Sequence, residues 1–355
     1  MNTIFLTLQR LLNQRELLDP AQRYVSIDDL SPATLLVYDP ALAHALLKSD
    51  AVIPADLLGS SLEVSRTPAG AVPTIESFFS QTPLLNHGEV HREMRKHLML
   101  RYRHVQALME SWLDSYSVQY FDSLEAGSAI RADALVSGYV NGLLRQMLAC
   151  ELECSVSQLP AFPDNLIFEF LPRFRDLKIR EAELHAAVQS LYQLLGERNR
   201  PMDDVWVLLT LVIMGHQPLL SALLYGLTRH DGPHRHGALS NDDAELFFRA
   251  VAPVDVISRQ VEREVCLEGV NFVPGQVLYV SPHLLHLHSD SLGLPGPPER
   301  SMTFGMGPHA CPGRKISVLV TQAFFNHLAQ ASHVLVDTAG IRWTRELMLI
   351  HKEMT

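Results

Sequence analysis

Residues 304–313 read Phe-Gly-Met-Gly-Pro-His-Ala-Cys-Pro-Gly and place one cysteine, Cys311, in a loop of glycines and prolines. A cysteine binds a metal as the thiolate, so its sulfur must be reachable and its charge must be stabilised. Gly307 and Gly313 let the backbone come close to the sulfur, and their amides can point at it. The stretch therefore predicts a cysteine that presents its sulfur to a bulky metal group.

The same residues resemble the haem-binding loop of the cytochrome P450 family, F-x-x-G-x-H-x-C-x-G, and every fixed position of that pattern is filled. The resemblance implies haem b as cofactor and a cysteine thiolate as the axial ligand of its iron. The cofactor-binding residues that it implies in this loop are Phe304, Gly305, His309, Cys311 and Gly313, with Cys311 as the metal ligand. Short motifs also occur by chance, and the alternative is a cysteine packed in an ordinary loop.

The composition is that of a globular protein, and the apolar pattern is mainly helical. The 355 residues are 47% hydrophobic and 19% charged, enough to bury a large core. Apolar residues at three- and four-residue steps predict helices. After an amphipathic helix near the N-terminus, we expect helices at 40–47, 90–112, 112–124, 130–153, 164–173, 181–198, 204–227 and 316–331, and strands within 34–38, 264–280 and 333–350. With the resemblance, this implies a mainly α, P450-like fold with a minor β region, as a single domain over 1–355.

Charge and cysteine usage exclude several classes of function. The formal net charge of −10 argues against a general nucleic-acid role, because phosphate binding needs a basic surface. Four scattered cysteines make no disulfide framework, which fits a reducing compartment. Polar residues interrupt the first apolar run, so we expect neither a signal peptide nor a membrane anchor. These observations predict a cytoplasmic protein that binds neither nucleic acid nor membrane.

Residues 204–227 form a long apolar stretch that is a membrane-spanning candidate by length alone. Gly-His-Gln-Pro at 215–218 puts two polar side chains and a helix breaker at its centre, and its flanks lack a positive bias. The central helix of a large soluble protein is also apolar all round. We therefore favour a buried helix.

The resemblance gives the centre of this helix a catalytic role. The family's central helix carries A/G-G-x-D/E-T, whose acid and hydroxyl deliver protons during oxygen activation. The residues that stand in that place, and that the resemblance implies face the distal pocket, are Gly215, His216, Gln217 and Pro218. Gln217 replaces the acid and Pro218 the threonine, and neither donates a proton as that pair does. We expect that protons come from a polar group of the substrate or from His216 through water, or else that much of the reducing power is lost as peroxide.

In the family, basic residues from three parts of the chain hold the haem propionates, and each of them has a counterpart here. The family's H-x-x-x-R pattern resembles His91 to Arg95, where the spacing puts both side chains on one helix face. Arg259 resembles an arginine of the strand that follows the Pro253 region, and His309 supplies the third position. Each could singly be a solvated surface charge, but their order with the cysteine matches the family.

One departure concerns the helix before Pro253, where the family has E-x-x-R bracing the cysteine loop. This chain has Glu245 and Arg249 at a spacing of four, E-x-x-x-R. If Arg249 keeps the family position, Leu246 takes that of the glutamate. We expect the haem site to remain and the bracing of the loop to differ.

The resemblance implies a soluble, bacterial-type haem-thiolate monooxygenase, an oxidoreductase for a small organic molecule in specialised metabolite biosynthesis. Its substrate would be free or bound to a carrier protein. The sequence shows no P-loop, dinucleotide motif or flavin segment, so electrons would come from a ferredoxin-type donor or from peroxide. Basic residues at 92, 96, 101, 103, 314 and 315 predict a docking patch for that donor. The alternatives are peroxide-dependent or rearrangement chemistry at the haem, and a catalytically silent docking module for a carrier protein.

Overall fold

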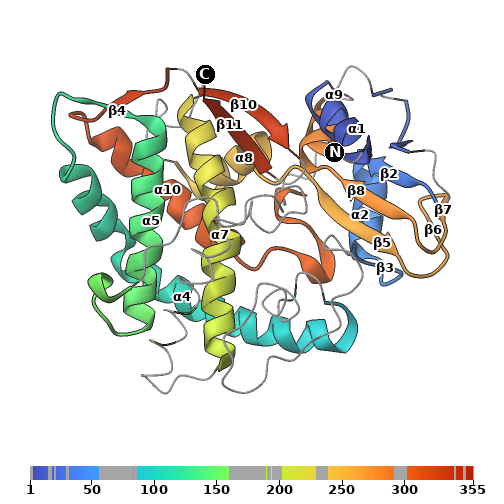
Figure 1. Ribbon diagram of the computed structural model, residues 1–355, viewed down its shortest axis with the longest axis horizontal. Coiled ribbons are helices and arrows are strands. Elements are labelled where there is room, and N and C mark those ends of the chain that lie inside the picture. Colours follow the sequence, from blue (N-terminus) through green and yellow to red (C-terminus); the bar gives the residue numbers. More distant parts are fainter. Residues whose placement is uncertain are drawn as a thin grey trace. The chain divides into compact units, whose positions relative to one another are not determined.

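The computed structural model describes most of the chain (Figure 1). The described residues are 3–14, 18–19, 21–28, 32–55, 83, 86–159, 189, 193, 202–228, 239–291, 302–339, 341–346 and 349–354. Contacts between Cα atoms divide the chain into two compact units. Unit 1 comprises Met1–Leu57, Asp242–Cys311 and Ala339–Thr355, and unit 2 comprises Leu58–Asn241 and Pro312–Thr338. A single domain over 1–355 stays a prediction.

Unit 1 is built on a five-stranded sheet in the order β1-β2-β8-β5-β3. The strands are β1 (Tyr24–Ser26), β2 (Thr34–Val37), β3 (Val52–Pro54), β5 (Ile257–Val261) and β8 (Val277–Val280). The β2 and β8 strands are parallel, and the other neighbours are antiparallel. All residues of β2 are buried, as expected for a strand covered on both faces.

Four helices and two hairpins complete the described part of unit 1. The helices are α1 (Thr3–Asn13), α2 (Pro40–Lys48), α8 (Asn241–Val251) and α9 (Pro282–Ser291). One hairpin pairs β6 (Val265–Leu267) with β7 (Val270–Phe272), and the other pairs β10 (Ile341–Glu346) with β11 (Leu349–Met354). Leu and Val side chains of α2, β2 and β8 share one buried cluster, which fixes α2 against the sheet.

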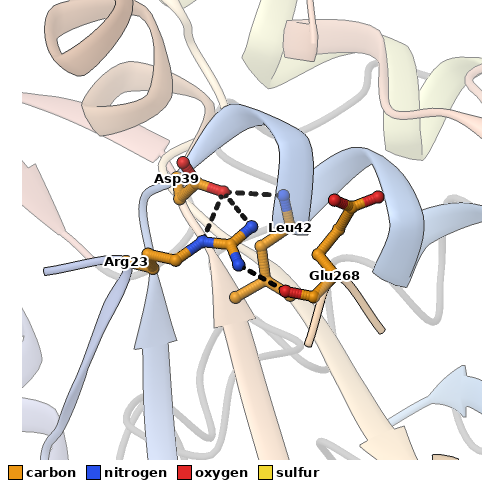
Figure 2. Close-up of polar contacts among 4 residues, drawn as sticks. All are labelled: Arg23, Asp39, Leu42 and Glu268. Carbon is orange, nitrogen blue, oxygen red and sulfur yellow. Dashed lines mark hydrogen bonds and ion pairs between the residues drawn. The ribbon is translucent and has the colours of Figure 1, made fainter. Parts of the chain in front are cut away.

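The Asp39 carboxylate fixes the start of α2 (Figure 2). Its Oδ1 accepts a hydrogen bond from the amide of Leu42 at 2.8 Å, which caps the helix. The same oxygen accepts hydrogen bonds from Nε and Nη2 of Arg23, at 3.1 and 2.8 Å. Nη1 of Arg23 donates to the carbonyl of Glu268 at 2.7 Å, in the turn of the β6–β7 hairpin. Two side chains thus join a strand, a helix cap and a hairpin.

Unit 2 is a helical bundle, coloured in Figure 1 from cyan through yellow-green to red. Its described helices are α4 (Gly88–Asp122), α5 (Ala132–Glu151), α7 (Met202–Thr228) and α10 (Arg314–Gln330), and η2 (Val156–Gln158) is a short 3-10 turn. A parallel pair, β4 (Ala129–Arg131) and β9 (Leu335–Asp337), completes the described part of the unit. Aromatic rings of α4, α5 and α10 form the core, where Tyr139 and Phe324 meet edge to face with centroids 4.9 Å apart.

Two glycines let α4 and α5 approach closely. The hydroxyls of Tyr116 and Tyr120 on α4 donate hydrogen bonds to backbone carbonyls of α5, both at 2.7 Å. A Cβ at Gly138 would lie 2.7 Å from the Tyr120 hydroxyl oxygen. A Cβ at Gly142 would clash with the Tyr116 hydroxyl in the same way. The pairing therefore needs glycine at both positions.

The mainly α architecture with a small β region is confirmed, and the helix boundaries differ in detail. The pattern predicted two helices that meet at Trp112, but α4 runs unbroken through it because no glycine or proline lies between them. The helices expected at 164–173 and 181–198 fall almost entirely outside the described residues, which include Gln189 and Gln193 as helical. The pattern missed β1, β3, β4 and α9.

The long apolar stretch forms α7, which continues through Pro218. Among the described residues, one helix segment, Thr210–Thr228, is long and apolar enough to cross a membrane by length and composition. However, 71% of that segment is buried within the structure, as in the core helix of a soluble protein. A single segment of this kind is weak evidence for a membrane span.

Candidate functional site

The cysteine loop belongs to unit 1 and is shaped by its own backbone. Two 3-10 turns, η6 (Met302–Phe304) and η7 (Gly307–His309), precede the cysteine. The amide of Cys311 donates to the carbonyl of Phe304 at 2.7 Å, which closes the loop. Gly305 and Gly307 have φ angles of +64° and +68°, which other residues rarely adopt. A Cβ on Gly307 would also clash with the carbonyl oxygen of Leu47 on α2, so glycine is required there.

The loop presents the cysteine outward within unit 1 and is anchored behind it to α8. Cys311 is exposed and is not in a disulfide. The Phe304 ring packs on the Phe248 ring with centroids 4.9 Å apart. The Thr303 hydroxyl donates to the carbonyl of Phe248 at 2.9 Å. The arrangement holds the loop by packing and leaves the sulfur reachable, as a metal ligand requires.

The α8 helix, which anchors the cysteine loop, also carries the altered E-x-x-R pattern. If Arg249 keeps its family position, Leu246 takes the position of the family's glutamate. Leu246 is 60% exposed. Glu245 is half-buried, with an oxygen fully shielded from solvent. The inward-facing acid of α8 is therefore Glu245, one residue earlier than in the family pattern.

Arg259 is a buried cation on β5, in the same unit as the loop. It is 6% exposed, and desolvation lowers its pKa from 12.5 to about 10. One guanidinium nitrogen donates to the carbonyl of Ser258 at 2.8 Å, and no carboxylate among the described residues pairs with it. Burying a charge without an opposite charge beside it costs several kcal/mol, and an anion next to Arg259 would offset that cost.

The other predicted haem-binding residues divide between the units. His309 of unit 1 is half-buried in η7. In unit 2, His91 is 3% exposed in the first turn of α4, and Arg95 is half-buried one turn later. Gly313 is the N-cap residue of α10, two positions after Cys311. Within unit 2, the expected H-x-x-x-R pair therefore lies on one helix face.

The α7 helix divides the four predicted catalytic residues between two faces. Gly215 is exposed, a Cβ there would meet no heavy atom of the described residues within 4 Å, and Pro218 is half-buried. At about 100° per residue, these two positions lie about 60° apart, whereas Gln217 lies about 200° from Gly215. His216 and Gln217 are 1% and 4% exposed. Helical geometry therefore puts Gly215 and Pro218 on an open face of α7, and the other two in the interior of unit 2.

The His216 ring is held by α5. Its Nε2 lies 2.7 Å from Oδ1 of Asn141, and Nδ2 of Asn141 lies 3.3 Å from Oγ of Ser137. Because an amide oxygen only accepts, Nε2 of His216 carries the proton in this contact. No sequence pattern signals this pairing, since the two residues are 75 positions apart. Gln217 differs, because its buried Oε1 has no hydrogen-bond partner among the described residues.

The basic patch predicted on α4 is smaller than the sequence indicated. Arg101 forms an ion pair at 2.8 Å with Glu151, whose side chain is 1% exposed. Arg92 forms an exposed pair with Glu89, also at 2.8 Å. Lys96 and Arg103 are exposed. Two of the four patch charges on α4 are thus compensated within the chain.

Comparisons with known proteins identify the architecture. No family model and no curated protein match the sequence. A six-coordinated cytochrome P450 from Thermus thermophilus matches with a TM-score of 0.71 at 18% identity, over 96% of this chain and 95% of that one. P450BioI, in complex with hexadec-9Z-enoic acid ligated acyl carrier protein, matches with a TM-score of 0.72 at 13% identity, over 98% and 97%. P450 RauA, complexed with a biosynthetic intermediate of aurachin RE, gives 0.66 at 15%, over 96% and 93%.

These likenesses extend over nearly the full length of both chains, at sequence identities too low to carry a function across. They agree with the order of the elements: α4, the long α7, then α8, β5 and the cysteine loop directly before α10. The fold of this chain is the fold of the bacterial cytochromes P450.

Proposed function

We propose that this protein is a haem-thiolate oxidoreductase of the monooxygenase type that oxidises a small organic molecule. The observation that carries the proposal is that unit 1 contains both an exposed cysteine in a glycine-shaped loop and a buried cation, Arg259. No described carboxylate forms an ion pair with this cation. Haem b offers a group for each of them, an iron for the thiolate and propionates for the guanidinium. The residues present therefore fit the group.

The roles that we assign follow the chemistry of each side chain. Cys311 would be the axial ligand, and His91, Arg95, Arg259 and His309 would hold the propionates. Phe304, Gly305 and Gly313 would shape the loop around the haem. When bound, a thiolate-ligated haem supplies the activation of oxygen. A propionate beside Arg259 would replace a costly unpaired charge by an ion pair, which couples cofactor binding to the stability of unit 1.

The protein's own residues on α7 would shape the substrate side. Gly215 leaves room along the helix, and Pro218 adds an apolar ring beside it. Neither side chain titrates, and the neighbouring His216 is engaged with Asn141. We infer that protons reach the reaction from the substrate or from water, rather than from an acid on this helix.

Electrons would come from a ferredoxin-type protein that docks on α4 and α10. The C-terminal part of α10 lies against α4, since His327 contacts Asp114 at 3.2 Å, and His333, just after α10, contacts the carbonyl of Phe121 at 3.0 Å.

The exposed charges left for such a partner would be Lys96, Arg103 and Lys315. An acidic partner suits this surface, and its docking would weaken with salt. The neighbour that carries an acyl carrier protein supports a carrier-bound substrate as one form of this proposal. The burial of most of Thr210–Thr228 within the structure supports a soluble protein, and a cytoplasmic location remains part of the proposal.

The test is the absorption spectrum of the reduced, carbon-monoxide-treated protein. A band at the position typical of thiolate ligation requires both haem and a cysteine ligand. We expect it in the wild type and in Cys266→Ser, which removes the other exposed cysteine, of β6. We expect it to be lost in Cys311→Ser. A normal band in Cys311→Ser, or its absence from the haem-loaded wild type, would contradict the proposal.

A further inference from the structure

The α7 helix carries a backbone hydrogen-bond acceptor that its own chain leaves without a helical donor. In an α-helix, the carbonyl of residue i accepts from the amide of residue i+4. Four residues after Met214 stands Pro218, which has no amide hydrogen, yet the helix continues through it. The carbonyl of Met214 therefore lacks the bond that the rest of the helix provides. Freed carbonyls of this kind normally bind a hydroxyl, a side chain or water.

The same carbonyl lies on the open side of α7. A helical carbonyl points toward residue i+4, so the Met214 oxygen lies next to the Pro218 ring. Gly215 follows directly and is exposed, and within the described part of the chain a Cβ there would meet no heavy atom within 4 Å. Any other residue at 215 would place a side chain beside the oxygen. Proline at 218 and glycine at 215 therefore act together, the first by freeing the acceptor and the second by leaving it uncovered.

We propose that the Met214 carbonyl is a binding site for a hydrogen-bond donor of the substrate, a hydroxyl or an N–H group. The proposal rests on the proposed function in taking the ligand as the molecule to be oxidised, and it narrows that molecule to compounds with such a donor. A carbonyl accepts and cannot donate, so ethers, ketones and pure hydrocarbons gain nothing at this site.

Matched pairs of small molecules test the proposal in the haem-loaded protein. Each pair is an alcohol and its methyl ether, from cyclohexanol to dodecan-1-ol, and each affinity is measured by calorimetry and by the shift of the haem absorption band. One neutral hydrogen bond predicts that the wild type binds the alcohol more tightly than its ether by a factor on the order of five. This factor is counted relative to the alcohol-to-ether ratio of the Pro218→Ala variant.

Pro218→Ala is the decisive variant, because it restores an amide that bonds to the Met214 carbonyl. We expect it to abolish the alcohol preference while both members of a pair still bind. Met214→Leu is the matched control, since it changes the side chain and keeps the carbonyl free, and we expect the preference to persist. Carbonyl-13C methionine labelling gives an independent readout, in which the Met214 resonance shifts with the alcohol and not with the ether.

The outcomes separate this inference from the proposed function. Equal affinity for alcohol and ether in every pair, no binding of either, or an unchanged preference in Pro218→Ala would overturn the acceptor site, even in a protein with the thiolate spectrum. Absence of that spectrum would instead overturn the proposed function, and the labelled Met214 resonance would still report the acceptor.

Discussion

Arg259 gives the sharpest prediction, because its charge should destabilise the haem-free protein and favour the binding of haem. We consider Arg259→Met, which keeps most of the side-chain volume and removes the charge. A pKa lowered from 12.5 to about 10 corresponds to a cost on the order of 3 kcal/mol for burying the cation. The variant also loses the hydrogen bond to the carbonyl of Ser258, and this loss offsets about 1–2 kcal/mol of the stability gained by removing the charge. The haem-free variant should therefore be more stable than the wild type by about 1–2 kcal/mol.

The sign of the pH dependence follows from the direction of the shift. The folded pKa lies below the unfolded one, so the cost is present in full at every pH below about 10 and falls only as the pH rises through that value. The gain of the variant should therefore be the same at pH 6 and pH 8. For a chain of this length it corresponds to a rise of about 2 °C in the melting temperature.

Circular dichroism melts of haem-free protein measure the first effect, and the haem content of protein purified with excess haem measures the second. We expect Arg259→Met to melt later without haem and to retain less haem. The matched control is Arg263→Met, just beyond the same strand, where the exposed arginine pairs with Asp50, and neither quantity should change there. A haem-free Arg259→Met protein that melts earlier than the wild type would refute the reasoning, because the guanidinium would then have a partner within the chain.

Two further predictions concern the scaffold. Asp39→Ala removes the α2 cap together with the Arg23 pair and should lower the free energy of unfolding by about 2 kcal/mol in urea melts, whereas Asp39→Asn keeps the cap and should lose less than half as much. Gly142→Ala should destabilise by about 1–3 kcal/mol through its clash with the Tyr116 hydroxyl. Tyr116→Phe should rescue part of that loss, and strictly additive effects would show that no such contact exists.

The local parts of the structure were readable from the sequence, because their signals lie within a few residues. The α7 helix could be predicted from its apolar run. The cysteine loop could be predicted from its glycines, two of which adopt positive φ angles. Strands of three residues such as β3 carry no periodic signal, since they exist by pairing with a partner some 200 positions away. The sequence likewise could not predict that no described carboxylate lies beside Arg259, because this depends on the tertiary positions of the acidic side chains.

The stretch 215–218 shows why a motif alone could not assign the chemistry of α7. Read as four consecutive letters, the residues suggest one group facing one pocket. A turn of 3.6 residues instead separates Gly215 and Pro218 from His216 and Gln217, and the Asn141 contact holds the histidine ring against α5. Of these four residues, the two on the open face have no titratable side chain, and the acceptor beside them is the backbone oxygen of Met214. An acceptor orients a donor and supplies no proton, so the group that it binds must itself belong to the substrate or to water.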